Sequence, residues 1–288
     1  MRRSTLKKLL DLDRRWIFLT VLICAIGARF VDFELPVYPK AGVRAMYDKI
    51  EEVAAKNGTI IVSMDYDPSS KPELEPLSRA LLRHAFSRKV KVIAMTHNPN
   101  GQRLAQTVLE ETASEFDVKY GDDYVLLGYK AGSGTLVINM GQDFRDAFSK
   151  DHAGKDLASF AVTRELTSIA QIDYVISVSA SAYWESWMIY GHDRYGFPYG
   201  VGVTGVIAPD IFPFLQTGQV TGLVGGLAGA AEYETLIKKP GMAVTGMKPQ
   251  SAIHMLLVLF VLFGNFVFFY DLVLKRRQEK GHREERRT

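Results

Sequence analysis

Two aspartates and a histidine are the residues in this sequence best suited to chemistry. Asp65 and Asp67 follow an apolar run at residues 59–64, and His97 follows another at residues 90–95. Carboxylate oxygens and an imidazole nitrogen could hold zinc or manganese and so support metal-assisted hydrolysis. An aspartate just after a strand more commonly forms an Asx turn or caps the next helix. We therefore expect these residues to contribute to a ligand site, and we expect neither a metal nor a cofactor.

Polar residues and glycines recur where the other apolar runs end. In an open α/β sheet, ligands bind outside the carboxyl ends of the strands, so these positions belong to the expected ligand site. With Asp65, Asp67 and His97, the candidate ligand-binding residues are Asn98, Gly132, Ser133, Ser179, Ser181, Trp184, Gly225 and Gly226.

No recognisable catalytic motif accompanies these candidates. The Gly-rich stretch at residues 128–135 lacks the GxxxxGK[ST] pattern and the helix-opening GxGxxG pattern, and we interpret it as a turn between two strands. Ser179 and Ser181 lack a GxSxG elbow. The catalytic residues therefore stay unassigned. Residues 183–199 are rich in aromatic side chains, which could line a pocket or a protein interface or belong to the core.

Alternating strand and helix patterns indicate the elements that position these residues. Amphipathic spacing predicts helices at residues 41–56, 73–88, 102–116, 157–170, 209–215 and 227–238. Apolar runs predict strands at residues 59–64, 90–95, 124–127, 135–140, 174–178, 201–207 and 220–224. Strands separated by helices imply right-handed crossovers. We predict a mostly parallel, Rossmann-like three-layer α/β domain, which polar residues near 141–156 could divide into two lobes.

Two glutamates and one cysteine give further expectations. Glu232 and Glu234 fall on opposite faces of the last predicted helix, so we expect one to be solvated and the other to pair with a lysine. Cys24 is the single cysteine, which excludes an internal disulfide framework and a Cys-rich metal site.

Two apolar segments flank the predicted domain. Residues 252–270 contain no Asp, Glu, Lys or Arg and are long enough to cross about 30 Å of hydrocarbon as a helix. Residues 16–28 are shorter, which suits a signal-peptide core or a short membrane helix, and we favour an uncleaved anchor. The sequence thus predicts an α/β domain at residues 32–250 between transmembrane helices at 16–31 and 251–274.

The distribution of charge predicts the topology. Lys and Arg dominate the leader at residues 1–15 and the tail at 275–288, so the positive-inside rule places both termini in the cytoplasm. The domain then lies in the periplasm or outside the cell, beyond the cell (inner) membrane. Its slight acidic excess argues against a nucleic-acid partner. Asn265, a polar residue in the second apolar segment, is the candidate contact with a second copy or a membrane partner.

Short stretches of the chain carry resemblances to known proteins. The helix–Gly–strand–Gly pattern at residues 214–226 is similar to a turn in periplasmic solute-binding proteins. YGDDYVLLGYKAG (120–132) together with GLVGGLAGAAEYE (222–234) resembles a family of uncharacterised membrane-anchored prokaryotic α/β proteins. That resemblance implies no known activity and transfers no catalytic residue.

Three functions are compatible with these features. The first is a membrane-tethered extracytoplasmic binding or assembly subunit without an evident catalytic site. The second is an extracytoplasmic metal-assisted hydrolase that uses Asp65, Asp67 and His97. The third is a purely structural component of a larger membrane complex. We expect the first.

Overall fold

The computed structural model describes residues 13–31 and 37–285. The chain divides into two units: Pro36–Thr245, and the terminal segments Met1–Leu35 and Gly246–Thr288. We describe each unit by itself. Because Pro36–Thr245 is one compact unit, there is no division into two lobes near residues 141–156. Most of the predicted leader, the junction at residues 32–36 and the last three residues lie outside the described residues.

Six strands form one all-parallel sheet in the order β3-β2-β1-β4-β5-β6. The strands are β1 (Thr59–Asp65), β2 (Lys91–Thr96), β3 (Tyr124–Tyr129), β4 (Tyr174–Ser179), β5 (Tyr199–Val203) and β6 (Gly222–Gly225). At the centre, β1 pairs with β4 from Ile60↔Tyr174 to Asp65↔Ser179. The strand order reverses between these two strands, and ligands bind at such a switch point in open α/β sheets.

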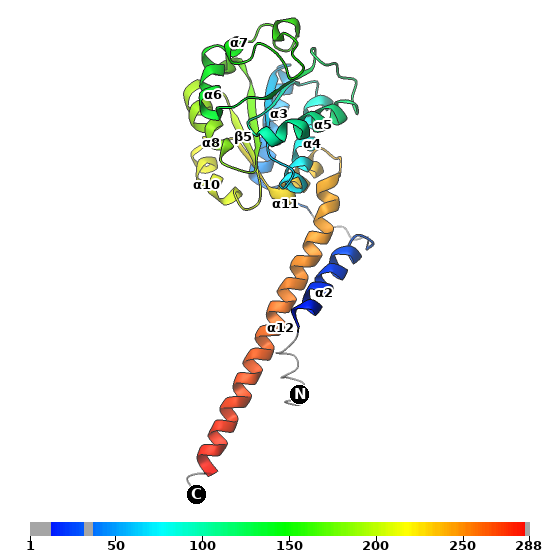
Figure 1. Ribbon diagram of the computed structural model, residues 1–288, viewed down its shortest axis with the longest axis vertical. Helices are drawn as coiled ribbons and strands as arrows, with labels where there is room; N and C mark the ends of the chain where they lie inside the picture. Colours follow the sequence, from blue (N-terminus) through cyan, green and yellow to red (C-terminus); the bar gives the residue numbers. More distant parts are fainter. Residues whose placement is uncertain (1–12, 32–36, 286–288) are drawn as a thin grey trace. The chain divides into compact units, whose positions relative to one another are not determined.

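Helices cover both faces of the sheet, which explains the nearly continuous apolar character of its strands (Figure 1). One face packs against α3 (Ala41–Ala55), α4 (Lys71–Ser87), α5 (Gln102–Ala113) and α11 (Gly226–Leu236). The other face forms a large apolar core with α6 (Ser133–Gln142), α7 (Phe144–Ala147), α8 (Tyr183–Trp187), η4 (Met188–His192), α9 (Asp193–Tyr195) and α10 (Ala208–Thr217). The predicted Rossmann-like α/β fold is therefore confirmed, and its sheet is parallel throughout.

Two predicted elements are wrong. Residues 135–140 form part of helix α6 and not a strand. Leu136, Val137 and Met140 are buried there at helical spacing. Residues 157–170 contain no long helix. They hold the short 3-10 turns η2 (Leu157–Ser159) and η3 (Ile169–Gln171), and a third such turn, η1 (Pro99–Gly101), precedes α5. Hydroxyl side chains compete with helical bonding in this stretch, since Thr163 Oγ1 donates to Leu157 O at 2.6 Å and Ser168 caps η3.

Both glutamates of α11 are buried. The Glu232 carboxylate accepts a hydrogen bond from the Lys40 N–H at 2.9 Å and pairs with the Lys40 ammonium at 3.3 Å. Glu234 accepts hydrogen bonds from the N–H groups of Gly241, Ala243 and Val244 at 2.8, 3.0 and 2.9 Å. Pairing with a lysine is thus confirmed for Glu232. The prediction that one of the two glutamates is solvated is wrong, because Glu234 accepts hydrogen bonds from the backbone where α12 (Met242–Glu285) begins.

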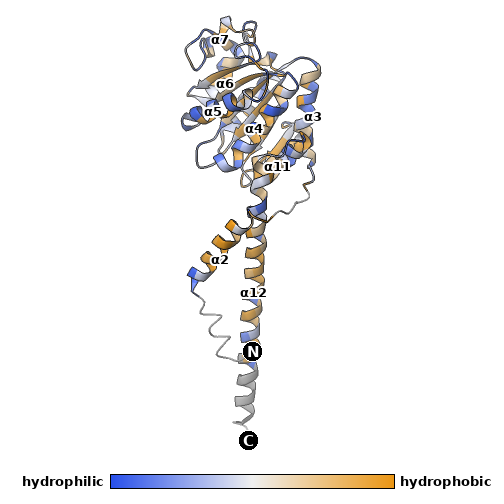
Figure 2. Cartoon of the chain, turned by 90° about the vertical axis from the view of Figure 1, so that its right-hand side faces the viewer, coloured by the Kyte–Doolittle hydropathy of each residue, from blue (hydrophilic) through white to orange (hydrophobic). Residues whose placement is uncertain are grey.

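One helix in the described part of the chain is long and apolar enough to cross a membrane. This is the stretch Met242–Leu274 of α12, which Figure 2 shows as largely hydrophobic. The N-terminal segment forms α2 (Arg14–Gly27), of 14 residues. At 1.5 Å per residue α2 is about 21 Å long, which is less than the hydrocarbon thickness of about 30 Å. The structure therefore has one candidate membrane helix and not the predicted two, because the apolar run in α2 is too short.

Candidate functional site

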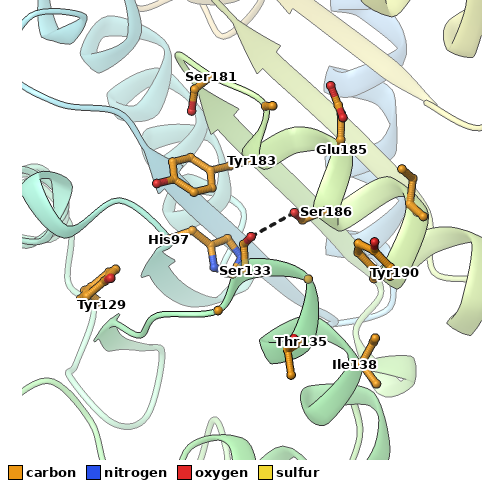
Figure 3. A pocket seen from close by; sticks show the side chains of 14 residues that line it. His97, Tyr129, Ser133, Thr135, Ile138, Ser181, Tyr183, Glu185, Ser186 and Tyr190 are labelled. Carbon is orange, nitrogen blue, oxygen red and sulfur yellow. Dashed lines mark hydrogen bonds between the residues drawn. The ribbon is translucent and has the colours of Figure 1, made fainter.

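A pocket of about 880 Å³ lies among the loops at the carboxyl edge of the sheet (Figure 3). The loop after β2 contributes His97, and the turn after β3 leads into the first turn of α6. The segment after β4 completes the wall. The lining residues are His97, Tyr129, Gly132, Ser133, Gly134, Thr135, Ile138, Ser181, Ala182, Tyr183, Glu185, Ser186, Ile189 and Tyr190.

The Gly-rich stretch after β3 opens helix α6 at this pocket. Gly132 begins the helix with φ 92°, a left-handed conformation that glycine adopts at little cost. The interpretation of this stretch as a turn between two strands is therefore wrong. No side chain caps α6. The N–H groups of its first turn have no acceptor within the helix, and the residues that carry them line the pocket.

The segment after β4 is an irregular helix that lines the opposite part of the pocket. Helix α8 continues into η4, a π-helical turn. Such turns are rare and frequently occur at functional sites. Ile189 and Tyr190 of η4 line the pocket, while Trp187 is fully buried. Ser186 Oγ donates to Ser133 Oγ at 3.2 Å and so connects this segment with the start of α6 (Figure 3).

His97 is the most unusual side chain at the pocket. It is 3% exposed, and neither ring nitrogen has a hydrogen-bond partner. Its ring centroid lies 6.0 Å from that of Tyr183 and 5.3 Å from that of Trp187. Burial lowers the pKa of the imidazole, so His97 is neutral at pH 7. A buried polar atom without a partner costs about 1–3 kcal/mol, which a ligand group bonded to His97 would recover.

Asp65 does not line the pocket but holds the loop that carries His97. Its carboxylate is fully buried and accepts hydrogen bonds from Ser63 Oγ at 2.8 Å and Ser177 Oγ at 3.2 Å. It also accepts the backbone N–H of His97 at 2.6 Å. Burial raises the pKa of Asp65. The carboxylate thus joins β1 and β4 and fixes the backbone of the loop that carries His97.

Four of the eleven predicted ligand-binding residues line this pocket: His97, Gly132, Ser133 and Ser181. Asp67 lies apart from it. Its carboxylate accepts hydrogen bonds from the Ser69 N–H at 3.0 Å and from Ser69 Oγ at 2.6 Å. The hydrogen bond from Ser69 Oγ lowers the pKa of Asp67. These contacts form the Asx turn named above as the commoner role of such an aspartate.

The remaining candidates hold local structure or line other surfaces. Asn98 Oδ1 accepts the Asn100 N–H at 2.9 Å and caps η1, and Ser179 Oγ donates to Ser181 O at 2.7 Å. Trp184 lines a separate pocket beside α10, and Gly225 lines another that includes Lys40. An added Cβ on Gly226 would lie 2.6 Å from Glu73 Oε1, so this glycine permits a close approach within the protein.

The three residues of the alternative metal site do not form a cluster of metal-binding side chains, although Asp65 accepts the backbone N–H of His97. No group of three or more His, Cys, Asp or Glu side chains in residues 13–31 and 37–285 is arranged to hold a metal ion. Both carboxylate oxygens of Asp65 already accept hydrogen bonds inside the protein. Asp67 Oδ1 accepts the hydrogen bonds of the Asx turn. The donor set expected for a metal-assisted hydrolase is therefore not assembled.

Sequence reasoning identified part of the pocket wall and missed the rest. Tyr183 and Tyr190 belong to the aromatic-rich stretch that could line a pocket, and both do so. The sequence patterns do not identify four other lining residues: Thr135, Ile138, Ser186 and Ile189. The signal that could have found the first two is the glycine pair at residues 132 and 134, read as the opening of a helix.

Comparison with family models, curated proteins and solved structures finds no match to the chain. The resemblances carried by residues 120–132, 214–226 and 222–234 therefore stay expectations. Inference of function rests on the pocket and on the candidate membrane helix.

Proposed function

We propose that this chain is a membrane-tethered protein whose α/β domain binds a small molecule on the outer side of the cell membrane. The observation that carries the proposal is the pocket at the carboxyl edge of the sheet. Its volume of about 880 Å³ suits a small ligand, since such sites measure about 300–1,000 Å³. Its edge is where open α/β sheets bind ligands. Hydroxyl groups and tyrosine rings provide polar and apolar contacts on the same wall.

The tether in this proposal is α12, whose stretch Met242–Leu274 is long and apolar enough to cross a membrane. Lys275, Arg276 and Arg277 follow the apolar part of α12, which favours a cytoplasmic C-terminus.

Filling the pocket is expected to weaken ligand binding. Thr135 is exposed on the first turn of α6 and lines the pocket, so Thr135→Trp places an indole in it without disturbing the core. We expect mass spectrometry of full-length protein, purified from native membranes in mild detergent, to find a small molecule bound near stoichiometrically. We expect Thr135→Trp to retain about tenfold less of it, because the indole occupies the same volume.

Asn139→Trp is the matched control for this experiment. Asn139 is also exposed on α6, one turn further along, and it is not a lining residue. This variant should retain the small molecule as the wild type does. Equal retention by Thr135→Trp and the wild type would refute the pocket as the binding site. Purification without any bound molecule, together with no thermal stabilisation by a metabolite library, would refute the binding function.

We further propose that Asn265 contacts a second copy of the chain or a membrane partner. Its side chain is exposed on α12, and an amide within an apolar helix favours association with another helix. Asn265→Leu is expected to reduce the mass of the complex extracted in mild detergent, as measured by light scattering. An unchanged mass would show that Asn265 has no part in assembly.

A further inference from the structure

We infer that the ligand carries a single anionic group, a carboxylate or a phosphate, which binds between the first turn of α6 and His97. This inference rests on the proposed function and specifies the chemical class of the ligand. Two independent features of the pocket carry it: an uncapped helix N-terminus, and a buried imidazole without a hydrogen-bond partner.

The first feature is the N-terminus of α6. This helix has ten residues, and no side chain caps it. Ser133, Gly134 and Thr135 line the pocket, and their N–H groups have no acceptor within the helix. The free N–H groups and the helix dipole together favour an anion at this end. The hydroxyl groups of Ser133 and Thr135 are additional donors at the same place.

The second feature is His97. The residue is 3% exposed, and both ring nitrogens are buried without a hydrogen-bond partner. Figure 3 shows the nitrogens pointing toward Ser133, where α6 begins. A neutral imidazole carries one N–H in either tautomer, so it can donate to an anionic oxygen. An oxygen placed there would satisfy the helix and the imidazole at once.

The charges around the pocket limit the size of the anionic group. Among the described lining residues there is no Lys or Arg, and Glu185 contributes a negative charge. A polyphosphate would lack compensating cations and would be repelled by this carboxylate. One carboxylate or one phosphate needs only the helix N-terminus and His97. Tyr129, Tyr183 and Tyr190 offer ring surfaces for the remainder of the molecule.

Anion binding can be tested with inorganic phosphate and acetate as probes. Full-length protein in detergent is heated at pH 7 with sodium phosphate, sodium acetate or sodium chloride at equal ionic strength. We expect phosphate or acetate to raise the unfolding temperature of the wild type more than chloride does, because either anion binds the folded state only. His97→Leu should weaken the binding of that anion about tenfold or more, since it removes a charge-assisted hydrogen bond.

Two further variants keep the test decisive. His97→Gln retains a side-chain N–H donor and should keep part of the stabilisation by phosphate or acetate. If His97→Leu does not fold, His97→Gln still tests the role of His97. His152→Gln is the control histidine: it lies outside the pocket lining and should respond as the wild type does. Equal stabilisation by phosphate, acetate and chloride, or an unchanged response in both His97 variants, would overturn the inference.

The anion inference can fail while the proposed function stands. A neutral molecule recovered from the wild type and lost in Thr135→Trp would overturn the anionic class and keep the pocket as the binding site. An anion response that persists in Thr135→Trp would place the anion outside the pocket and overturn the inference as well.

Discussion

Asp65→Leu is expected to lower the free energy of unfolding by about 3 kcal/mol or more. The substitution removes the acceptor of the His97 N–H and of the Ser63 and Ser177 hydroxyl groups, all in a fully buried environment. The hydroxyl groups can turn to other acceptors, whereas the backbone N–H cannot. Urea unfolding of the full-length protein in detergent, followed by tryptophan fluorescence, measures the loss.

Asp65→Asn separates the hydrogen bonds of this side chain from its charge. The amide oxygen can accept from His97 and Ser63, and the NH₂ group can donate to Ser177, so we expect little loss of stability. Because burial raises the pKa of Asp65, the folded state keeps its proton to higher pH than the unfolded state does. The wild type therefore loses stability as the pH rises from about 4 through the folded pKa.

The asparagine variant does not titrate at this position. Its stability relative to the wild type should consequently increase as the pH rises through the same window. Unfolding curves between acidic and neutral pH test the sign. We expect Asp65→Asn to destabilise the protein less than Asp65→Leu does. Equal destabilisation at every pH would contradict the role of Asp65 as a buried hydrogen-bond acceptor whose charge is not required.

Glu234→Leu is expected to lower the free energy of unfolding by about 3 kcal/mol. This carboxylate is 1% exposed and accepts the N–H groups of Gly241, Ala243 and Val244. Without it, the buried N–H group of Ala243 and the half-buried N–H groups of Gly241 and Val244 lose their acceptor where α12 begins. Amide hydrogen exchange at residues 241–244 should accelerate in the variant, in addition to the shift of the unfolding curve.

Glu234→Gln tests whether an amide at this position can replace part of the hydrogen bonding of the carboxylate. The Gly241 and Val244 N–H groups share one carboxylate oxygen, which the amide oxygen can replace, while the NH₂ group would face the Ala243 N–H. We expect a loss smaller than that of Glu234→Leu. Unchanged exchange at residues 241–244 in both variants would show that the cap does not hold the start of α12.

Much of the fold could be predicted from local patterns. The runs at residues 59–64 and 174–178 are apolar because β1 and β4 are covered on both faces, and such runs predict strands. The run at residues 135–140 has the same apolar character but forms α6. Its composition fits a buried strand and a buried helix face equally. The feature that distinguishes the two is Gly132, which adopts a left-handed conformation directly before α6.

Sheet topology predicts which loops contribute to the site, but it does not predict how their side chains pack. The rule that ligands bind at the carboxyl ends of strands placed His97 and Ser181 among the candidates. The lack of a hydrogen-bond partner for His97 depends on Tyr183 and Trp187, which pack against its ring from a distant part of the chain. The role of Glu234 depends on backbone N–H groups seven to ten residues away, which helix periodicity does not indicate.

Cysteine labelling measures directly on which side of the membrane the α/β domain lies. Cys24 is the single cysteine, so a Cys24→Ser background leaves no other thiol. Lys56→Cys places an exposed thiol at the end of α3. Thr288→Cys places a thiol in the last residue of the sequence. A membrane-impermeant maleimide is added to intact cells from which any outer envelope has been removed.

We expect the maleimide to label position 56 in intact cells and position 288 only after the membrane is permeabilised. Labelling of position 288 with protection of position 56 would reverse the topology and move the ligand to the cytoplasm. Labelling of both positions in intact cells would contradict a cytoplasmic C-terminus, and protection of both would contradict an extracytoplasmic domain.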